Sequence, residues 1–238
     1  MKKIHLNFAH NSHYNSQKIN SESALRYGFD VSLNFSLNDI DSNFYEKNKH
    51  ILTQPRGAGY WLWKPYFILK VLNECEYGDI IFYTDSGCFF ISHPEPLLDL
   101  LNGQDIIPFV IDPEPGNKEV LQTKRDCFIL MDCDSEEYTQ TYAIGASFIL
   151  LKKTILSEKF IKDYLFFSQN DKCITDTPST LNSEYSEFNT HRHDQSIYSL
   201  LCKKYKLNFY RDPSQWGNRF NLNKEKYNQI IEHTRYNG

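Results

Sequence analysis

Residues 78–88 combine the composition of a buried strand with a polar turn that could bind a cation. The apolar run at 80–83 is rich in β-branched and aromatic side chains, as expected for a strand covered on both faces of a mostly parallel sheet. Asp85, Ser86 and Gly87 follow this run. Ligands bind beyond the carboxyl ends of strands in open α/β sheets, and a carboxylate there can hold Mg²⁺ or Mn²⁺, which in turn binds a diphosphate. The alternative is a simple turn in which Asp85 caps the backbone and Gly87 supplies a positive φ.

A second stretch, residues 56–64, holds two cations, two glycines and three aromatic side chains. Glycines permit a close approach of the backbone to a ligand, and Arg56 and Lys64 could neutralise phosphates. Lys64 precedes a proline at an expected helix start, a position that favours facing an anion, and Trp61 is a candidate for a sugar pocket. The alternative is that the tryptophans fill the core while the two cations are solvated.

Residues 191–195 form the densest polar cluster and stand just before an expected helix. Asp194 and His193 are candidate catalytic residues, and His191 and Gln195 are candidates for the acceptor or sugar pocket. An acid, two imidazoles and a guanidinium can orient a hydroxyl, stabilise charge or take a proton. If Asp194 only caps the helix, it contributes about 1 kcal/mol, and the flanking His-Arg-His is left unexplained.

Two weaker signals come from small side chains and from a late histidine. Residues 139–147 lead into an apolar run, and Ala146 and Ser147 would suit the wall of a carbohydrate pocket. His233 could share a metal ion with Asp85, because Mn²⁺ accepts both oxygen and imidazole ligands. The alternative is that His233 is a surface residue, as a single histidine in a C-terminal tail more often is.

The elements that must position these residues alternate along the chain. Strands are expected at 4–8, 31–35, 80–83, 105–111, 146–151 and 207–210. Helices are expected at 15–27, 36–49, 65–75, 92–102, 123–131, 157–168 and from 194 onward. Alternating strands and helices predict an α/β sandwich. The polar stretch 169–191 is long for a loop and is therefore expected to be functional or mobile.

Composition favours one globular domain spanning residues 1–238. The net charge of −4, without a basic tract, argues against a nucleic-acid partner, and no stretch approaches the length of a membrane span. The beginning of the chain lacks the apolar core of a signal peptide. Six cysteines without paired C-x-x-C spacing indicate free thiols in a reducing compartment. The sequence thus predicts a soluble, cytoplasmic protein.

Four motifs in a fixed order resemble a known family. They are Gly-Tyr-Trp-Leu-Trp-Lys-Pro at 59–65, Gly-Asp-Ile-Ile-Phe-Tyr-Thr-Asp-Ser-Gly-Cys at 78–88, Ala-Ser-Phe-Ile at 146–149 and His-Asp-Gln-Ser at 193–196. Over residues 4–216 the chain resembles the small GT-A-type glycosyltransferases of bacterial surface-polysaccharide loci and of large DNA viruses that glycosylate their capsids. The resemblance implies a single GT-A-like (Rossmann-like) domain, with a mixed, mostly parallel sheet flanked by helices.

This resemblance also implies a nucleotide-diphospho-sugar donor, with a UDP-sugar favoured, and Mn²⁺ or Mg²⁺ at the carboxyl edge of the sheet. Residues 85–87 stand for the Asp-x-Asp motif of the wider superfamily, and Gly87 replaces its second acid. Either the metal is not required, or another residue such as His233 supplies the missing ligand. The nucleotide would contact the residues that follow the first strand, Phe8, Ala9 and His10. Asp194 falls where such enzymes place an acid near the reacting sugar.

The implied reaction transfers a sugar to a glycan acceptor in surface-polysaccharide or glycoprotein glycan assembly. A metal ion together with Lys64 or Arg56 would offset the charge that develops on the leaving diphosphate. If Asp194 acts as a general base, the reaction inverts the anomeric centre. If Asp194 only stabilises positive charge on the reacting sugar, transfer with retention is also possible. Residues 169–191 would close over the acceptor and exclude water, and the tail 212–238 would complete the site.

Two other functions fit the same residues less well. A sugar nucleotidyltransferase would carry a glycine-rich basic loop after the first strand, where this chain has His-Asn-Ser-His-Tyr at 10–14. A non-catalytic carbohydrate-binding or scaffold module on the same fold is favoured only by the incomplete acidic motif. Tight, metal-dependent binding of UDP distinguishes a transferase from such a module.

Overall fold

Short apolar strands build a six-stranded sheet at the centre of the molecule. The computed structural model describes residues 1–224 and 226–234. The strands of the sheet are β1 (Lys3–Phe8), β2 (Val31–Phe35), β3 (Ile80–Thr84), β5 (Ile106–Val110), β6 (Ile144–Lys152) and β7 (Tyr210–Arg211). Their order is β2-β1-β3-β6-β5-β7, and β1–β2, β1–β3 and β5–β7 are parallel, while β6 is antiparallel to both neighbours. The predicted α/β class, with a mixed and mostly parallel sheet flanked by helices, is confirmed.

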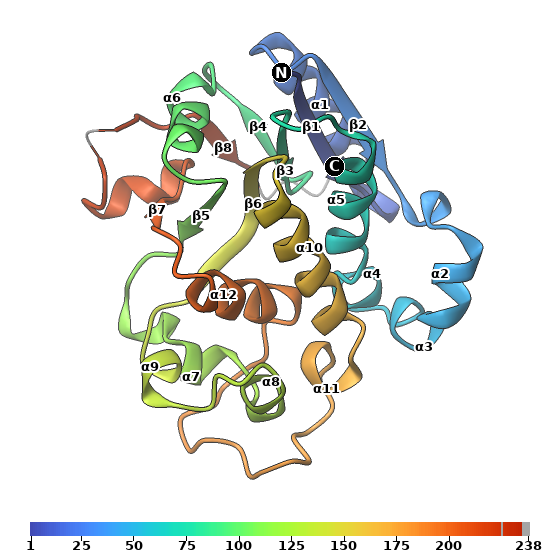
Figure 1. Ribbon diagram of the computed structural model, residues 1–238, viewed down its shortest axis with the longest axis vertical. Helices are drawn as coiled ribbons and strands as arrows, with labels where there is room; N and C mark the ends of the chain where they lie inside the picture. The colour runs from blue at the N-terminus through green and yellow to red at the C-terminus, as the bar shows by residue number, and fades with distance from the viewer. Residues whose placement is uncertain (225, 235–238) are drawn as a thin grey trace.

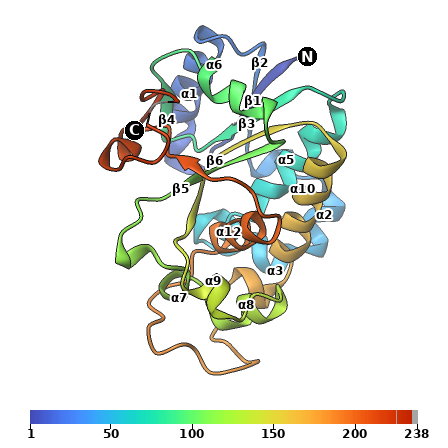
Figure 2. The same ribbon diagram turned by 60° about the vertical axis from the view of Figure 1, so that its left-hand side comes forward.

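Helices cover both faces of this sheet. They are α1 (Tyr14–Arg26), α2 (Ser42–Lys47), α3 (Lys49–Leu52), α4 (Gly57–Tyr60), α5 (Trp63–Glu74), α6 (Glu95–Leu98), α7 (Glu119–Gln122), α8 (Arg125–Leu130), α9 (Glu136–Thr139), α10 (Ile155–Ser168), α11 (Asp171–Ile174) and α12 (Asp194–Lys204). Helices α5, α10 and α12 lie on one face and α1 on the other (Figures 1 and 2). Within the described part of the chain, no helix is both long and apolar enough to cross a membrane.

The period of two in the strands divides the interior into two cores. In β3 the side chains of Ile81 and Tyr83 join the core beneath α5, α10 and α12, whereas Ile80 and Phe82 join the core on the side of α1. All five residues of β3 are buried, which explains why its sequence is continuously apolar rather than alternating. The strand therefore brings its carboxyl end to a fixed point between the two cores.

A polar side chain of β1 lies in the core on the side of α1. His5 is fully buried, with its Nδ1 at 2.7 Å from the Ser32 hydroxyl and its Nε2 at 2.9 Å from the Thr84 hydroxyl. Burial lowers the pKa of this imidazole from 6.5 to about 3, so the ring is neutral in the folded protein.

A small antiparallel ladder beside the main sheet was not predicted. It pairs β4 (Cys88–Phe90) with β8 (Ile231–His233), so that Cys88 lies opposite His233. Strands of three residues are too short for their alternation to stand out in the sequence. The ladder matters because it brings the end of the described chain next to residues 85–87. Residues 225 and 235–238 of the predicted closing tail lie outside the described residues.

Several predicted boundaries were wrong for local reasons. The single helix expected at 36–49 is instead a 3₁₀ turn, capped by Ser36 and Asp39, followed by the separate short helices α2 and α3. The expected helix at 92–102 is only the short α6 and a 3₁₀ turn. The helix expected at 123–131 begins only at Arg125, and the Thr123 hydroxyl donates instead to the buried carboxylate of Glu119 at 2.8 Å. The last strand of the sheet is β7, later than the expected 207–210.

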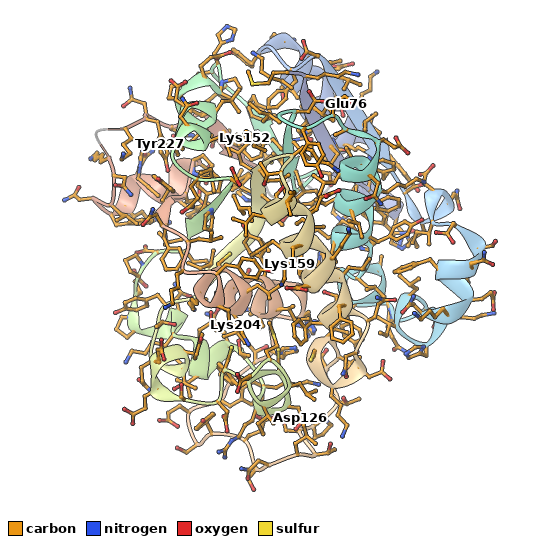
Figure 3. All side chains as sticks on the ribbon, in the orientation of Figure 1. Glu76, Asp126, Lys152, Lys159, Lys204 and Tyr227 are labelled. Atoms are coloured by element: carbon orange, nitrogen blue, oxygen red, sulfur yellow. The ribbon has the colours of Figure 1, made fainter. Side chains whose placement is uncertain are left out.

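The polar segment 169–191 contains α11 and then a loop held by buried side chains. The Lys124 ammonium donates to the carbonyl oxygens of Thr175 at 2.8 Å and Thr177 at 3.1 Å. The Asp126 carboxylate accepts from the N–H groups of residues 180 and 181. Figure 3 labels Asp126 at the end of the molecule that this loop wraps. Closure of the segment over an acceptor stays a prediction.

Candidate active site

A cavity of about 780 Å³ opens at the carboxyl ends of β1 and β3. Four parts of the chain supply its walls. They are Phe8 with residues 10–13, the turn before α5 (Pro55, Gly57, Ala58, Trp61 and Trp63), the end of β3 (Tyr83 and residues 85–87) and the C-terminal segment (His233 and Thr234). The sheet edge predicted to bind a ligand therefore carries a cavity of ligand size.

Asp85 presents its carboxylate to this cavity. Its backbone N–H donates to the Ser147 carbonyl at 2.9 Å, which fixes the main chain at the end of β3. Its Oδ1 accepts a hydrogen bond of 2.6 Å from the Tyr83 hydroxyl, and the side chain is 33% exposed. The simple turn does not describe this geometry, because the carboxylate contacts side chains and Gly87 does not have a positive φ.

The C-terminal segment packs directly against Gly87. The Thr234 N–H donates to the Gly87 carbonyl at 2.8 Å, and a Cβ added to Gly87 would lie only 3.2 Å from the Thr234 carbonyl oxygen. The same segment carries His233 into the cavity wall, with its ring edge against Phe148 at a centroid distance of 5.3 Å. Glycine thus makes room for the strand that delivers the histidine.

Two side chains, Asp85 and His233, could hold a divalent cation here. They line the same cavity, and carboxylate and imidazole together suit Mn²⁺. Among residues 1–224 and 226–234, no group of three or more His, Cys, Asp or Glu side chains is arranged to bind a metal. A cation at this point would therefore need the donor phosphates and water to complete its coordination.

Lys64 and Asp194 meet directly behind Asp85. The Lys64 ammonium lies 2.8 Å from Asp194 Oδ2, 3.0 Å from the Ala146 carbonyl oxygen and 3.7 Å from Asp85 Oδ1. Tyr164 donates to the same Asp194 oxygen at 2.9 Å. Both Lys64 and Asp194 are 3% exposed, and neither is among the described residues that line the cavity.

Burial and the neighbouring charges shift the pKa values of Lys64 and Asp194. Burial alone would lower the pKa of Lys64, but the carboxylates of Asp194 and Asp85 raise it above its usual value, so Lys64 is an ammonium. Burial raises the pKa of Asp194, against the opposing effects of Lys64 and Tyr164. The sequence identified all three charged residues, and the fold brings them together, with only Asp85 reaching the cavity.

The glycine-rich stretch forms a left-handed turn, which the sequence did not predict. Five successive residues, 57–61, have φ between 51° and 96°. Non-glycine residues in this conformation cost roughly 1–2 kcal/mol each. The Trp63 indole N–H donates to the Gly57 carbonyl at 2.9 Å, and a Cβ on Gly57 would lie 2.3 Å from the Trp61 ring. The turn therefore sets Trp61 into the cavity wall over the bare face of Gly57.

Arg56, the other side chain predicted to neutralise phosphates, does not line the cavity. Its side chain is 51% exposed and its Nη1 lies 3.5 Å from Asp176 Oδ2. Among the described lining residues there is no lysine or arginine; the basic side chains present are His10, His13 and His233. A diphosphate bound here would therefore meet imidazoles rather than fixed positive charges.

The histidines of the 191–195 cluster are packed behind the wall. His191 is buried, its Nε2 at 2.7 Å from the Cys173 carbonyl oxygen and its Nδ1 at 3.3 Å from the Lys124 N–H. His193, with φ 55°, has its Nδ1 at 2.8 Å from the Ile174 carbonyl oxygen. Its Nε2 has no hydrogen-bond partner among the described residues, and its ring stacks 5.5 Å from that of Trp61.

The remaining predicted residues line the cavity, contribute backbone groups to the site, or lie beside the cavity. Phe8 and His10 line it, whereas Ala9 is buried with its N–H on the Phe35 carbonyl. Ala146 and Ser147 contribute carbonyl oxygens, to Lys64 and to the Asp85 N–H respectively. Gln195 is half-buried and does not line the cavity.

Sequence reasoning missed Tyr83 and His13. Tyr83 stands two residues before Asp85, and the period of two in a strand places such residues on the same face. That signal was present in the sequence. His13 follows the first strand in a stretch that has neither glycine nor lysine nor arginine, so nothing in the sequence marks it. The 3₁₀ turn at Asn11–His13 places it on the cavity wall.

The fold is that of an α/β domain shared with solved glycosyltransferases. Mouse xyloside xylosyltransferase 1 in its apo form aligns with 99% of this chain and 98% of its own, at 9% identity and a TM-score of 0.50. The bifunctional glycosyltransferase WbbM in its apo form aligns at 10% identity and a TM-score of 0.53, with 99% of this chain covering 46% of WbbM.

A third solved structure is a glycosyltransferase involved in the glycosylation of the major capsid of PBCV-1. It covers 98% of this chain and 93% of its own, at 9% identity and a TM-score of 0.49. No protein-family model matches the sequence, and no curated protein matches it. At these identities the xylosyltransferase and WbbM matches establish the fold alone.

Proposed function

We propose that the protein is a glycosyltransferase that binds a nucleotide-diphospho-sugar, with a UDP-sugar favoured, in the 780 Å³ cavity. The observation that carries the proposal is the Asp85 carboxylate, which the end of β3 holds open to that cavity. The fold shared with solved glycosyltransferases supports it. The acceptor proposed is a glycan of a surface polysaccharide or a glycoprotein, and six free cysteines support the proposed cytoplasmic location.

A divalent cation, Mn²⁺ or Mg²⁺, belongs to this proposal. Asp85 and His233 would hold it, and it would supply electrostatic stabilisation of the leaving diphosphate. The lining supports this assignment, because its described residues offer no lysine or arginine to neutralise the phosphates.

The other lining residues would bind and orient the donor. Residues 8–13 at the end of β1 would contact the nucleotide, and His10 and His13 can donate hydrogen bonds to it. Trp61 would present its indole face to a sugar ring, held in place by the left-handed turn. Arg56 lies on Asp176 rather than on the cavity, so we assign it no contact with the phosphates.

The stereochemical course is not fixed by Asp194. Its Oδ2 is bound to Lys64 and Tyr164, and the side chain is buried behind the cavity wall. We therefore do not assign Asp194 the role of general base, and the proposal includes both retaining and inverting transfer.

Binding of nucleotides to the intact chain tests the proposal. The melting temperature is measured with UDP, GDP and UDP-sugars, each with and without Mn²⁺, because a ligand that binds only the folded state stabilises it. UDP should stabilise the protein more strongly in the presence of Mn²⁺ than in its absence, and Asp85→Asn should remove this Mn²⁺-dependent part while leaving weaker, metal-independent binding of UDP. The matched control is Asp99→Asn, an exposed carboxylate outside the cavity. Binding of free sugars without nucleotide would instead indicate a carbohydrate-binding module.

A further inference from the structure

Lys64 and Asp194 form a buried ion pair that lies next to Asp85, the proposed metal ligand. We propose that this pair positions Asp85, holding its Oδ1 inward so that Oδ2 is presented to the donor cavity. Lys64 and Asp194 are then positioning residues and make no contact with the donor. This inference rests on the proposed function, and it gives both residues a role different from that expected from the sequence.

Among the described residues, the side-chain contacts of Asp85 all fall on one oxygen. The Tyr83 hydroxyl at 2.6 Å and the Lys64 ammonium at 3.7 Å both approach Oδ1 from the interior. Tyr83 is 2% exposed and Lys64 3% exposed, whereas the Asp85 side chain is 33% exposed. We therefore assign the exposed part of the carboxylate to Oδ2, the oxygen on which no interior contact of a described residue falls.

Lys64 is itself held by acceptors on two other elements. The Ala146 carbonyl on β6 and the Asp194 carboxylate at the start of α12 lie 3.0 Å and 2.8 Å from its ammonium. Tyr164 on α10 donates to Asp194 Oδ2. The ammonium thus lies within hydrogen-bond distance of two acceptors, and its third anionic or polar neighbour is Asp85, an ionic contact at 3.7 Å. The position of Asp85 is tied through one lysine to α5, β6, α12 and α10.

Stability alone is a poor reason for this arrangement. Removing a lysine and an aspartate from water costs several kcal/mol per ion, and a hydrophobic replacement of a buried pair is often neutral or stabilising. The pair has no net charge, so it adds little to the electrostatic potential in the cavity. What it supplies to Asp85 is a fixed ionic contact at Oδ1, which orients the carboxylate as the partners of metal ligands do.

The test is a double variant, Lys64→Met with Asp194→Asn, which removes both charges together and leaves no unpaired buried ion. The affinity for UDP in the presence of Mn²⁺ is measured by calorimetry, and the free energy of unfolding by urea. We expect the affinity to fall at least tenfold. The chain offers a matched control in Lys203 and Glu119, a second buried pair at 2.5 Å that lies outside the cavity wall. The variant Lys203→Met with Glu119→Gln should change stability but leave the UDP affinity within twofold.

The same double variant made in the Asp85→Asn background separates positioning from a general disturbance. If the pair acts through Asp85, its removal causes no further loss of affinity there. An equal tenfold loss in both backgrounds overturns the inference, as does wild-type affinity of the double variant. If Asp85→Asn by itself leaves UDP binding unchanged, the proposed function fails instead. Should the double variant not fold, Asp194→Asn alone carries the same comparison.

Discussion

The neutral, buried imidazole of His5 makes the stability of this fold depend on pH in a way that can be calculated. Its pKa is about 3 in the folded protein, against the ordinary value of 6.5 that the residue has in an unfolded chain. Between these values the unfolded state binds a proton that the folded state does not, so stability rises with pH over this range. The stabilising effect is complete above pH 6.5 and is lost progressively as the pH falls toward 3.

The expected magnitude follows from these two pKa values. Lowering the pH from 7 to 5 should cost about 2 kcal/mol of unfolding free energy through His5 alone, since one pKa unit corresponds to about 1.4 kcal/mol. His191, whose pKa burial also lowers well below 6.5, acts in the same direction. The contribution of His5 is therefore isolated by comparing the wild-type protein with His5→Gln.

Urea unfolding followed by tryptophan fluorescence at pH 7 and pH 5 measures this contribution. The wild type should lose about 2 kcal/mol more than His5→Gln between the two pH values. The variant Ser32→Ala serves as the control, because it removes a hydrogen bond to the same imidazole without removing the titrating group. Equal losses in wild type and His5→Gln would show that His5 is protonated in the folded state and would refute the reasoning.

Three further predictions concern the cavity and the segment beside it. Gly57→Ala should lower the unfolding free energy by roughly 1–2 kcal/mol and weaken UDP binding, because its Cβ displaces the Trp61 ring; unchanged calorimetric affinity would contradict this. Removal of divalent cations with EDTA should lower UDP affinity at least tenfold in wild type but not in Asp85→Asn, and equal losses would exclude Asp85 as the ligand. Asp126→Asn should cost about 1–3 kcal/mol and speed proteolysis within residues 175–190, as seen by mass spectrometry of the fragments; an unchanged cleavage rate would exclude the anchoring role of Asp126.

The parts of the fold that the sequence predicts are those with a local cause. β3 is recognisable because burial on both faces leaves five apolar or small residues in a row, and α10 because its apolar face repeats with the helical period. The ladder of β4 and β8 has no comparable signal, since its three-residue strands are defined by each other. Its existence depends on a pairing between segments far apart in the sequence, and only the folded chain reveals it.

The candidate site likewise contains features that the sequence predicts and features that only the folded chain reveals. The sequence places Asp85 after a buried strand, and the fold puts it on the cavity wall, because a parallel sheet opens at the carboxyl ends of its strands. It also predicts a functional role for Lys64, but it cannot say whether the ammonium meets a ligand or another side chain. That outcome is decided by Asp194 and Tyr164, which arrive on separate helices and set the Lys64 ammonium against the interior side of Asp85.

Charged residues are therefore harder to interpret from a sequence than apolar ones. An apolar residue in a strand has one favourable environment, and its period tells which face will provide it. A lysine such as Lys64 can pair with a phosphate in a cavity or with a carboxylate in the interior, and these two partners leave the same local pattern in the sequence. In this chain the interior carboxylate of Asp194 pairs with the lysine. Under the proposed function, a cation held by Asp85 and His233 would therefore neutralise the donor diphosphate.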